Sequence, residues 1–326
     1  MQKTHMLGIA LGLGLALVSA QHAHAQSAAF PVKPVRIISP FPPGGSVDTV
    51  ARLLALEITK PLGQQVVVDN RSGASGNIGT ELAKNAAPDG YTLLLNTMPF
   101  VTNQFIYSKV PADPIVDFAP ISLLSSSPSL LTVHPSLPVK SVRELLALAR
   151  AKPGALNYAS AGAATNPHIA GELFNYLGKT NLVVIHFKGG GPGLTATLSG
   201  ETQVTFSNIS ETMPLVQAGR LRALGVTSLK RAAVAPNLPT IAEAGLPGYE
   251  FTTWHALVAP RGTPPAVVKT LSDAVRTTLR SPDTAQKFAT RGLDAIGSTP
   301  DELATHLKSE VQKWGRVIKE RGMRAE

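Results

Sequence analysis

The 326-residue chain contains no cysteine, which excludes disulfide bonds, thiolate zinc sites, a cysteine nucleophile and a lipid-anchored cysteine. Aromatic residues make up only 5% of the chain, too few for a nucleic-acid surface built from stacking side chains. Charged residues account for 16% and hydrophobic residues for 44%, which is enough apolar material for a large buried core. The length predicts two domains.

The N-terminus predicts an exported protein. Lys3 precedes a nearly pure apolar run at residues 6–20, and Ala23-His24-Ala25 gives a small-x-small cleavage pattern. The run is about 15 residues long, whereas a membrane span needs roughly 20. We therefore expect residues 1–25 to be a cleaved signal peptide and the mature protein to be periplasmic. A retained signal anchor is the alternative, but no second apolar run of that length follows.

After this segment, short apolar strands alternate with amphipathic helices. Residues 66–68 and 91–95 are typical buried strands, and residues 47–58 carry apolar side chains at helical spacing. This alternation indicates sheets with parallel strands that are covered by helices on both faces. The pattern forms two units with no flexible linker between them. We therefore expect strands to cross between the units and to permit hinge closure on a ligand.

Three glycine-rich turns, at residues 39–46, 159–167 and 187–193, each lead from a strand into a helix. In the second turn we expect Asn166 to cap the helix and Pro167 to be its first residue. Free backbone N–H groups at a helix start carry partial positive charge and bind anions without arginine. Gly, Pro and Ser also build ordinary loops, but three such turns in two units favour an anion site in the crevice between them.

Catalytic and metal chemistry have less support. Ser160 lies in a turn similar to a nucleophile elbow, and Glu211 and His255 could complete a hydrolase triad in that chain order. Tyr158 stands where such a turn needs a small residue, which counts against this alternative. His168, in the first turn of its helix, is a candidate ligand contact. The histidines lack metal-ligand spacing, so we expect no metal and no cofactor.

The formal net charge of +9 does not predict nucleic-acid binding, because the basic residues are spread along most helices. The densest group, at residues 313–324, is interleaved with glutamates and is typical of a solvated surface. A general positive field would instead steer small anions towards the protein.

Several segments form a specific combination that extends over essentially the whole mature chain. They are PVRIISPFPPGG (residues 34–45) with Asp48 and Arg52, Asn70-Arg71, GNIG (76–79), APDGY (87–91), DFAPI (117–121), NYASAG (157–162) and LPTIAEAGLPG (238–248). This combination resembles the Bug-type receptors, the extracytoplasmic solute-binding proteins of the tripartite tricarboxylate transporter family.

The resemblance implies a two-lobed α/β periplasmic-binding-protein fold, type II-like, with the ligand in the interlobe cleft. Each lobe would be a mostly parallel sheet flanked by helices. We place the first lobe at residues 26–124 plus 252–326 and the second at residues 125–251.

The resemblance also implies a receptor without catalytic activity that holds a carboxylate through backbone amides, hydroxyls and ordered water. The expected partners are a small organic anion and the membrane subunits of a transporter, with a signalling sensor protein as the alternative, and the receptor itself would be a monomer. The ligand-binding candidates carried over by position are Phe41, Gly44, Gly45, Ser46, Asp48, Thr97, Ser160, Ala161, Gly162, Thr165, His168, Lys188, Gly189 and Asn208.

The chain departs from the family pattern at three places near these candidates. Phe187 and Ser207 stand where many relatives have tyrosine and aspartate, and residues 96–100 are bulkier and more apolar than the usual small polar loop. We therefore include aromatic and less polar acids among the expected ligands.

Overall fold

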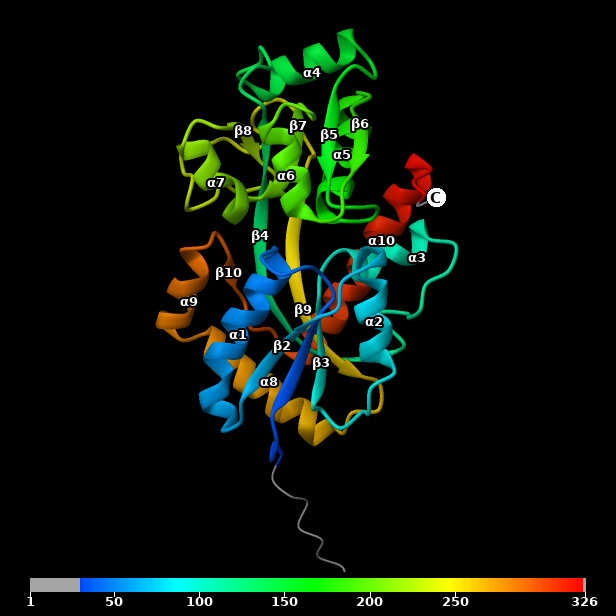
Figure 1. The fold of residues 1–326 in the computed structure, drawn as a ribbon, viewed down its shortest axis with the longest axis vertical. Coiled ribbons are helices and arrows are strands. Elements are labelled where there is room, and N and C mark those ends of the chain that lie inside the picture. The colour runs from blue at the N-terminus through cyan, green and yellow to red at the C-terminus, as the bar shows by residue number, and fades with distance from the viewer. Residues whose placement is uncertain (1–29, 325–326) are drawn as a thin grey trace, which may run out of the picture.

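The computed structural model describes residues 30–324 and has two lobes joined by two long strands, β4 and β9 (Figure 1). The predicted signal peptide lies outside the described residues. The strands are β1 (Val35–Ser39), β2 (Val66–Asn70), β3 (Thr92–Asn96), β4 (Phe118–Val133), β5 (Asn157–Ser160), β6 (Val183–His186), β7 (Val204–Asn208), β8 (Arg222–Val226), β9 (Thr252–Pro260) and β10 (Asp294–Ala295).

Helices flank the strands in both lobes. They are α1 (Ser46–Leu62), the 3₁₀ turn η1 (Ala74–Gly76), α2 (Asn77–Lys84), α3 (Pro99–Ile106), α4 (Val142–Ala151), α5 (Asn166–Gly178), α6 (Gly190–Leu198), α7 (Ile209–Gln217), α8 (Pro265–Leu279), α9 (Pro282–Ala289) and α10 (Pro300–Arg321). Sequence-predicted caps start three of them: Ser141 and Ser281 accept hydrogen bonds from backbone N–H groups of α4 and α9, and Thr299 forms a capping box with Glu302.

The sheet follows the order β2-β1-β3-β9-β4-β7-β5-β6, and β8 and β10 also pair with β4. The expected parallel pairing is present in β2-β1-β3 of the first lobe and in β6-β5-β7 of the second. The long strands β4 and β9 pair antiparallel with each other. In addition, β9 pairs antiparallel with β3 and β4 pairs antiparallel with β7, so the sheet of each lobe contains both parallel and antiparallel pairs. The parallel strands in each lobe direct their carboxyl ends towards the other lobe.

The lobes share β4, a strand of 16 residues. Its first part, Phe118 to Pro128, pairs with β9, and its last part, Ser129 to Val133, pairs with β7. Strands therefore cross between the lobes without a linker, as the sequence predicts. The predicted boundary after residue 124 falls inside this strand, and the exact lobe limits stay a prediction.

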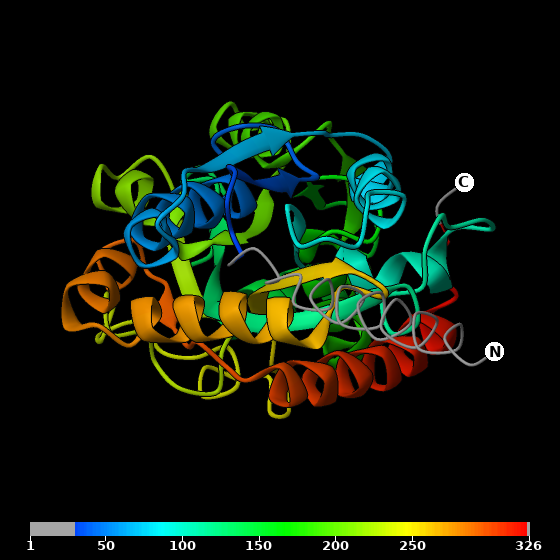
Figure 2. The same cartoon turned by 90° about the horizontal axis from the view of Figure 1, so that it is seen from below.

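Two hydrophobic clusters cover the faces of the first sheet. One contains Ile37 and Leu257 with side chains of α1, α8 and α9. The other contains Leu94 with side chains of α2, α3 and α10, and it continues into the second lobe through Leu131 and Tyr158. Figure 2 shows α10 running along the outside of the first lobe. Within residues 30–324, no helix combines the length and the apolar character needed to cross a membrane.

Candidate ligand-binding site

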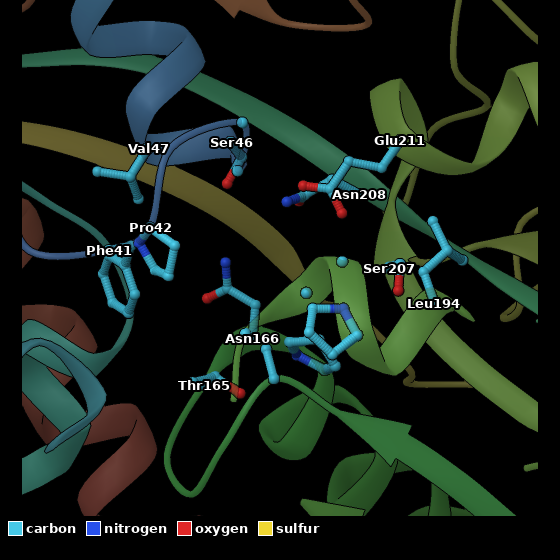
Figure 3. A pocket seen from close by; sticks show the side chains of 18 of the residues that line it. Phe41, Pro42, Ser46, Val47, Thr165, Asn166, Leu194, Ser207, Asn208 and Glu211 are labelled. Atoms are coloured by element: carbon cyan, nitrogen blue, oxygen red, sulfur yellow. The ribbon is translucent and has the colours of Figure 1, made fainter. Parts of the chain in front are cut away.

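A cavity of about 450 Å³ lies between the lobes and is lined by residues from both (Figure 3). In the first lobe, the wall is formed by the turn from β1 into α1 and by the residues after β3. In the second lobe, it is formed by the turns from β5 into α5 and from β6 into α6, together with the end of β7. Each of these turns follows the carboxyl end of a strand, which is where α/β folds bind ligands.

The turn before α1 is held in place by Asp48, a residue that is only 3% exposed. The Asp48 carboxylate accepts hydrogen bonds from Gly44 N (3.0 Å), Arg52 Nε (2.9 Å) and Asn70 Nδ2 (2.9 Å). Burial alone would raise the pKa of Asp48, but these hydrogen bonds lower it overall, so the group is ionised. Gly44 has φ +85°, a left-handed conformation that glycine adopts without strain.

The turn after β5 is closed by its own hydroxyl groups. Ser160 Oγ donates to Gly162 O at 2.8 Å, and Thr165 Oγ1 donates to the same oxygen at 2.7 Å. Gly162 has φ +129°, which favours glycine. The helix α5 begins at Asn166 with Thr165 in the cap position, so the predicted assignment of Asn166 as the cap is wrong by one residue.

The turn after β6 packs against the turn after β5. Phe187 N donates to Ser160 O at 2.9 Å, and Gly189 N donates to Ala161 O at 3.2 Å. Gly189 has φ +113° and precedes α6, which starts with two further glycines. The absence of side chains there brings the backbone of the α6 start to the cavity surface.

Glu211, in the first turn of α7, reaches across to the first lobe. The backbone N–H of Ser46, at the start of α1, and the side chain of Asn208 face its carboxylate. Burial raises the pKa of Glu211, and these two polar groups oppose that increase. Figure 3 shows Glu211, Asn208 and Ser46 close together, with Asn166 on another side of the cavity.

The structure brings ten of the fourteen predicted site residues to the cavity wall. They are Phe41, Gly44, Gly45, Ser46, Thr97, Ala161, Thr165, Lys188, Gly189 and Asn208. The remaining four, Asp48, Ser160, Gly162 and His168, do not line the cavity. Asp48, Ser160 and Gly162 shape the turns that do, as described above.

His168 lies behind the wall, where its Nδ1 accepts a hydrogen bond from Ala164 N at 3.1 Å. Its ring packs edge-on against His186, with 4.8 Å between the ring centroids. Burial, together with the neighbouring His186, lowers the pKa of His168 to about 3. The imidazole is therefore neutral, and it holds the turn that leads into α5.

The cavity is lined by thirteen further residues that were not among the ligand-binding candidates from the sequence. They are Pro42, Pro43, Val47, Pro99, Asn166, Pro167, Gly190, Gly191, Pro192, Leu194, Phe206, Ser207 and Glu211. Most belong to the predicted turns or directly follow them, so their positions could have been inferred. Glu211 gave no comparable signal, because it lies one helical turn beyond the end of β7.

The structure does not assemble the alternative hydrolase triad. Ser160 Oγ is engaged with Gly162 and Thr165, whereas His255 Nδ1 lies 3.1 Å from Ser125 Oγ in the crossing strands. Glu211 contacts Asn208 and Ser46 instead of a histidine. Within the described part of the chain, no group of three histidine, aspartate or glutamate side chains is arranged to hold a metal ion.

Two α/β lobes that share crossing strands and enclose a cavity between helix starts define a solute-binding protein of the periplasmic-binding-protein fold. Residues 50–323 match the family described as tripartite tricarboxylate transporter family receptor, and the chain belongs to this family. A UPF0065 protein from the tcbD-tcbE intergenic region of Pseudomonas sp. strain P51 is 37% identical over 95% of this chain and 92% of its own length. Protein BugT of Bordetella pertussis is 34% identical over 99% of both chains.

Solved structures show the same architecture. Rpa4515 of R. palustris with adipate superposes with a TM-score of 0.87 at 36% identity, covering 90% of this chain and 99% of its own. The periplasmic binding protein BugD gives 0.85 at 31% identity, covering 91% and 100%. MatC of Rhodopseudomonas palustris with bound malate gives 0.83 at 32% identity, covering 89% and 100%.

Proposed function

We propose that this protein is a periplasmic receptor that captures a small carboxylate between its lobes and delivers it to a membrane transporter, without catalysing a reaction. The observation that carries the proposal is the convergence of three helix starts, those of α1, α5 and α6, on one interlobe cavity of about 450 Å³. Backbone N–H groups at helix starts are suited to carboxylates. The adipate and malate held by two similar proteins support the same ligand class.

Direct contacts and exclusion of water must supply most of the affinity. A helix start contributes at most about 2 kcal/mol, whereas micromolar binding needs roughly 8 kcal/mol. Cross-lobe hydrogen bonds are available for closure: Ser75 Oγ donates to Ala163 O at 2.8 Å, and Thr102 Oγ1 donates to Ala164 O at 3.0 Å. A ligand that joins the two walls would add to these contacts.

The first test is calorimetric titration of the mature protein after removal of co-purified ligand, with aspartate, glutamate, succinate, malate, citrate, nicotinate and terephthalate. A one-to-one complex with no product formed supports the proposal. Native mass spectrometry of the untreated protein identifies a ligand outside this panel. If the untreated protein releases no small acid and none of the seven acids binds, the proposal is wrong.

Two variants of Gly45 test the role of the α1 start. The φ of Gly45 is −78°, within the range that proline adopts, so Gly45→Pro removes the backbone N–H without forcing the turn. Gly45→Ala keeps the N–H, and its Cβ would lie 3.7 Å from Pro42 O, an ordinary contact. We expect Gly45→Pro to weaken binding at least about ten-fold and Gly45→Ala to retain it. Equal affinities would show that this helix start does not bind the ligand.

Delivery to a transporter needs a separate measurement. Cross-linking of the ligand-loaded receptor to membranes, followed by identification of the captured subunits, distinguishes a transporter from the sensor protein that is the alternative partner.

A further inference from the structure

The cavity wall contains only two ionisable side chains among the described residues that form it, Lys188 and Glu211. Lys188 is exposed and lies in the turn before α6, at the rim. Glu211 is partly buried and lies in the first turn of α7. A site built from helix starts therefore also contains a fixed acidic group, and this group must affect which ligands it accepts.

Glu211 occupies a position that a ligand carboxylate would otherwise use. The backbone N–H of Ser46 is one of the donors at the start of α1 that has no partner within the helix, and it faces the Glu211 carboxylate and favours its ionised form. Glu211 Oε2 also lies near the start of α6, since a Cβ built on Gly190 would be 3.5 Å from it. One anion position of the cavity is thus filled by the protein itself.

The surroundings of Glu211 do not neutralise its charge. The two groups that favour its ionised form, the Ser46 N–H and the Asn208 side chain, are both uncharged. Burial raises the pKa of Glu211, which means that the ionised carboxylate has a higher free energy here than in water. A ligand ammonium or hydroxyl group would reduce that difference, whereas a second ligand carboxylate would increase it.

The remaining wall restricts the body of the ligand. Phe41 and Pro42 line one side, and Pro192, Leu194 and Phe206 line the second lobe. These side chains offer no hydrogen bonds, so they favour an apolar carbon skeleton between two polar ends. The Gly45 N–H at the start of α1, the starts of α5 and α6, and Lys188 remain to bind the first carboxylate.

We propose that Glu211 selects ligands by the charge of their second end. The site accepts a monocarboxylate with an apolar body and a hydrogen-bond donor, either an ammonium or a hydroxyl group, at the opposite end. It discriminates against a dicarboxylate of the same length. This inference rests on the proposed function and adds to it the substrate class.

The test uses ligands that differ only at the second end. The aliphatic set is adipate, 6-hydroxyhexanoate and 6-aminohexanoate, and the aromatic set is terephthalate, 4-(hydroxymethyl)benzoate and 4-(aminomethyl)benzoate. In calorimetric titrations of the wild-type mature protein, we expect the donor-bearing acids of at least one set to bind at least about ten-fold more tightly than its dicarboxylate.

Three variants separate the effect of charge from that of shape. Glu211→Gln keeps the size and an acceptor oxygen but removes the charge, so the preference for donor-bearing acids should fall at least about ten-fold. Glu211→Asp keeps the charge and should retain the direction of the preference. Glu201→Gln, at an exposed position, makes the same change in net charge and should leave all affinities unchanged. Thermal denaturation of each variant confirms that it is folded.

The inference is overturned if the wild-type protein binds the dicarboxylates as tightly as the donor-bearing acids, or if Glu211→Gln leaves the ratio unchanged. Absence of binding by all six acids also overturns it. The proposed function would still stand in each case if native mass spectrometry finds another carboxylate on the untreated protein, so the two failures are distinguishable.

Discussion

Ser75, in the first lobe, donates a hydrogen bond from Oγ to the backbone oxygen of Ala163 in the second lobe, at 2.8 Å. Ser75 Oγ in turn accepts a hydrogen bond from Tyr107 OH at 3.0 Å. The backbone of Ser75 is left-handed, with φ +51°, in the 3₁₀ turn before α2. A residue in a strained conformation thus joins the two lobes next to the cavity, and we expect opening of the lobes to break this contact.

Ser75→Ala should weaken ligand binding by about two- to ten-fold, because a hydrogen bond of about 0.5–1.5 kcal/mol is lost from the closed state. The loss should appear mainly as faster dissociation, measured by surface plasmon resonance with the ligand found by calorimetry. Tyr107→Phe is the matched control, since it leaves the bond between Ser75 and Ala163 in place and should have a smaller effect. Identical dissociation rates for Ser75→Ala and wild type would contradict the assignment.

Asp48→Ala should reduce both stability and affinity. The change leaves Gly44 N without its acceptor and removes one of the two acceptors of Asn70 Nδ2, which also donates to Phe41 O, and this costs about 1–3 kcal/mol in the free energy of unfolding. The turn at residues 40–45 would then lose the position that forms part of the cavity wall. Urea denaturation and calorimetry measure the two effects. Arg52→Gln removes only the exposed partner and should change stability much less; a larger loss in Arg52→Gln than in Asp48→Ala would refute this ranking.

Lys188→Gln should weaken carboxylate binding by no more than about five-fold, because the side chain is exposed at the rim and its charge is screened. The difference from wild type should shrink as salt rises from 50 mM towards roughly 1 M in the titration buffer. Lys308→Gln, on the surface of α10, makes the same charge change and should leave affinity unaltered. A hundred-fold loss for Lys188→Gln would mean that the lysine, and not the backbone, binds the carboxylate.

Acidification should destabilise the fold through two buried histidines. Burial lowers the pKa of His255 to about 3, and burial with the neighbouring His186 lowers that of His168 to about 3. The unfolded chain binds protons near pH 6.5 while the folded protein does not, so stability falls as the pH drops below 6.5 towards 3. Each histidine contributes a slope of about 1.4 kcal/mol per pH unit.

Urea denaturation at several pH values between 7 and 4 measures this slope. His255→Gln should reduce it by the share of one histidine, and the double change with His168→Gln by the share of two, which leaves the part due to His186 and His306, whose pKa values burial also lowers. The experiment contradicts the assignment if the double variant retains the wild-type dependence on pH.

Much of the fold could be predicted because burial on both faces leaves a clear pattern in short parallel strands. The segment at residues 66–68 is the beginning of β2, and the segment at residues 91–95 largely coincides with β3. The strand β4 was not predicted, because residues 125–129 are four serines and one proline and carry no apolar pattern. Three of these serines, Ser125, Ser127 and Ser129, are buried by tertiary contacts: Ser127 Oγ, for instance, donates to Gly292 O at 2.8 Å, far away in sequence.

The site residues also fall into those that local sequence predicts and those that depend on the tertiary structure. Glycine-rich turns are local features, so Gly44, Gly45 and Gly189 could be placed at the cavity from the sequence. Ser160 and His168 have the residue types of ligand contacts, but their polar atoms are used by the turn itself. Glu211 depends on the approach of α7 to α1 across the cleft, which only the tertiary structure determines.

The paired strands β4 and β9 connect the two lobes and so limit how the lobes can move relative to each other. The strands β4 and β9 pair from Phe118 to Pro128, with register shifts between Pro120 and Ser122 and between Leu123 and Ser125, and the side chains of His255 and Ser125 lie 3.1 Å apart across the pair. A pair of strands bends without losing its hydrogen bonds, whereas sliding one strand along the other would break the register. We therefore expect the lobes to open mainly by bending of this strand pair, with little sliding between the strands. Such a motion would bring the same residues of the two lobes face to face at each closure.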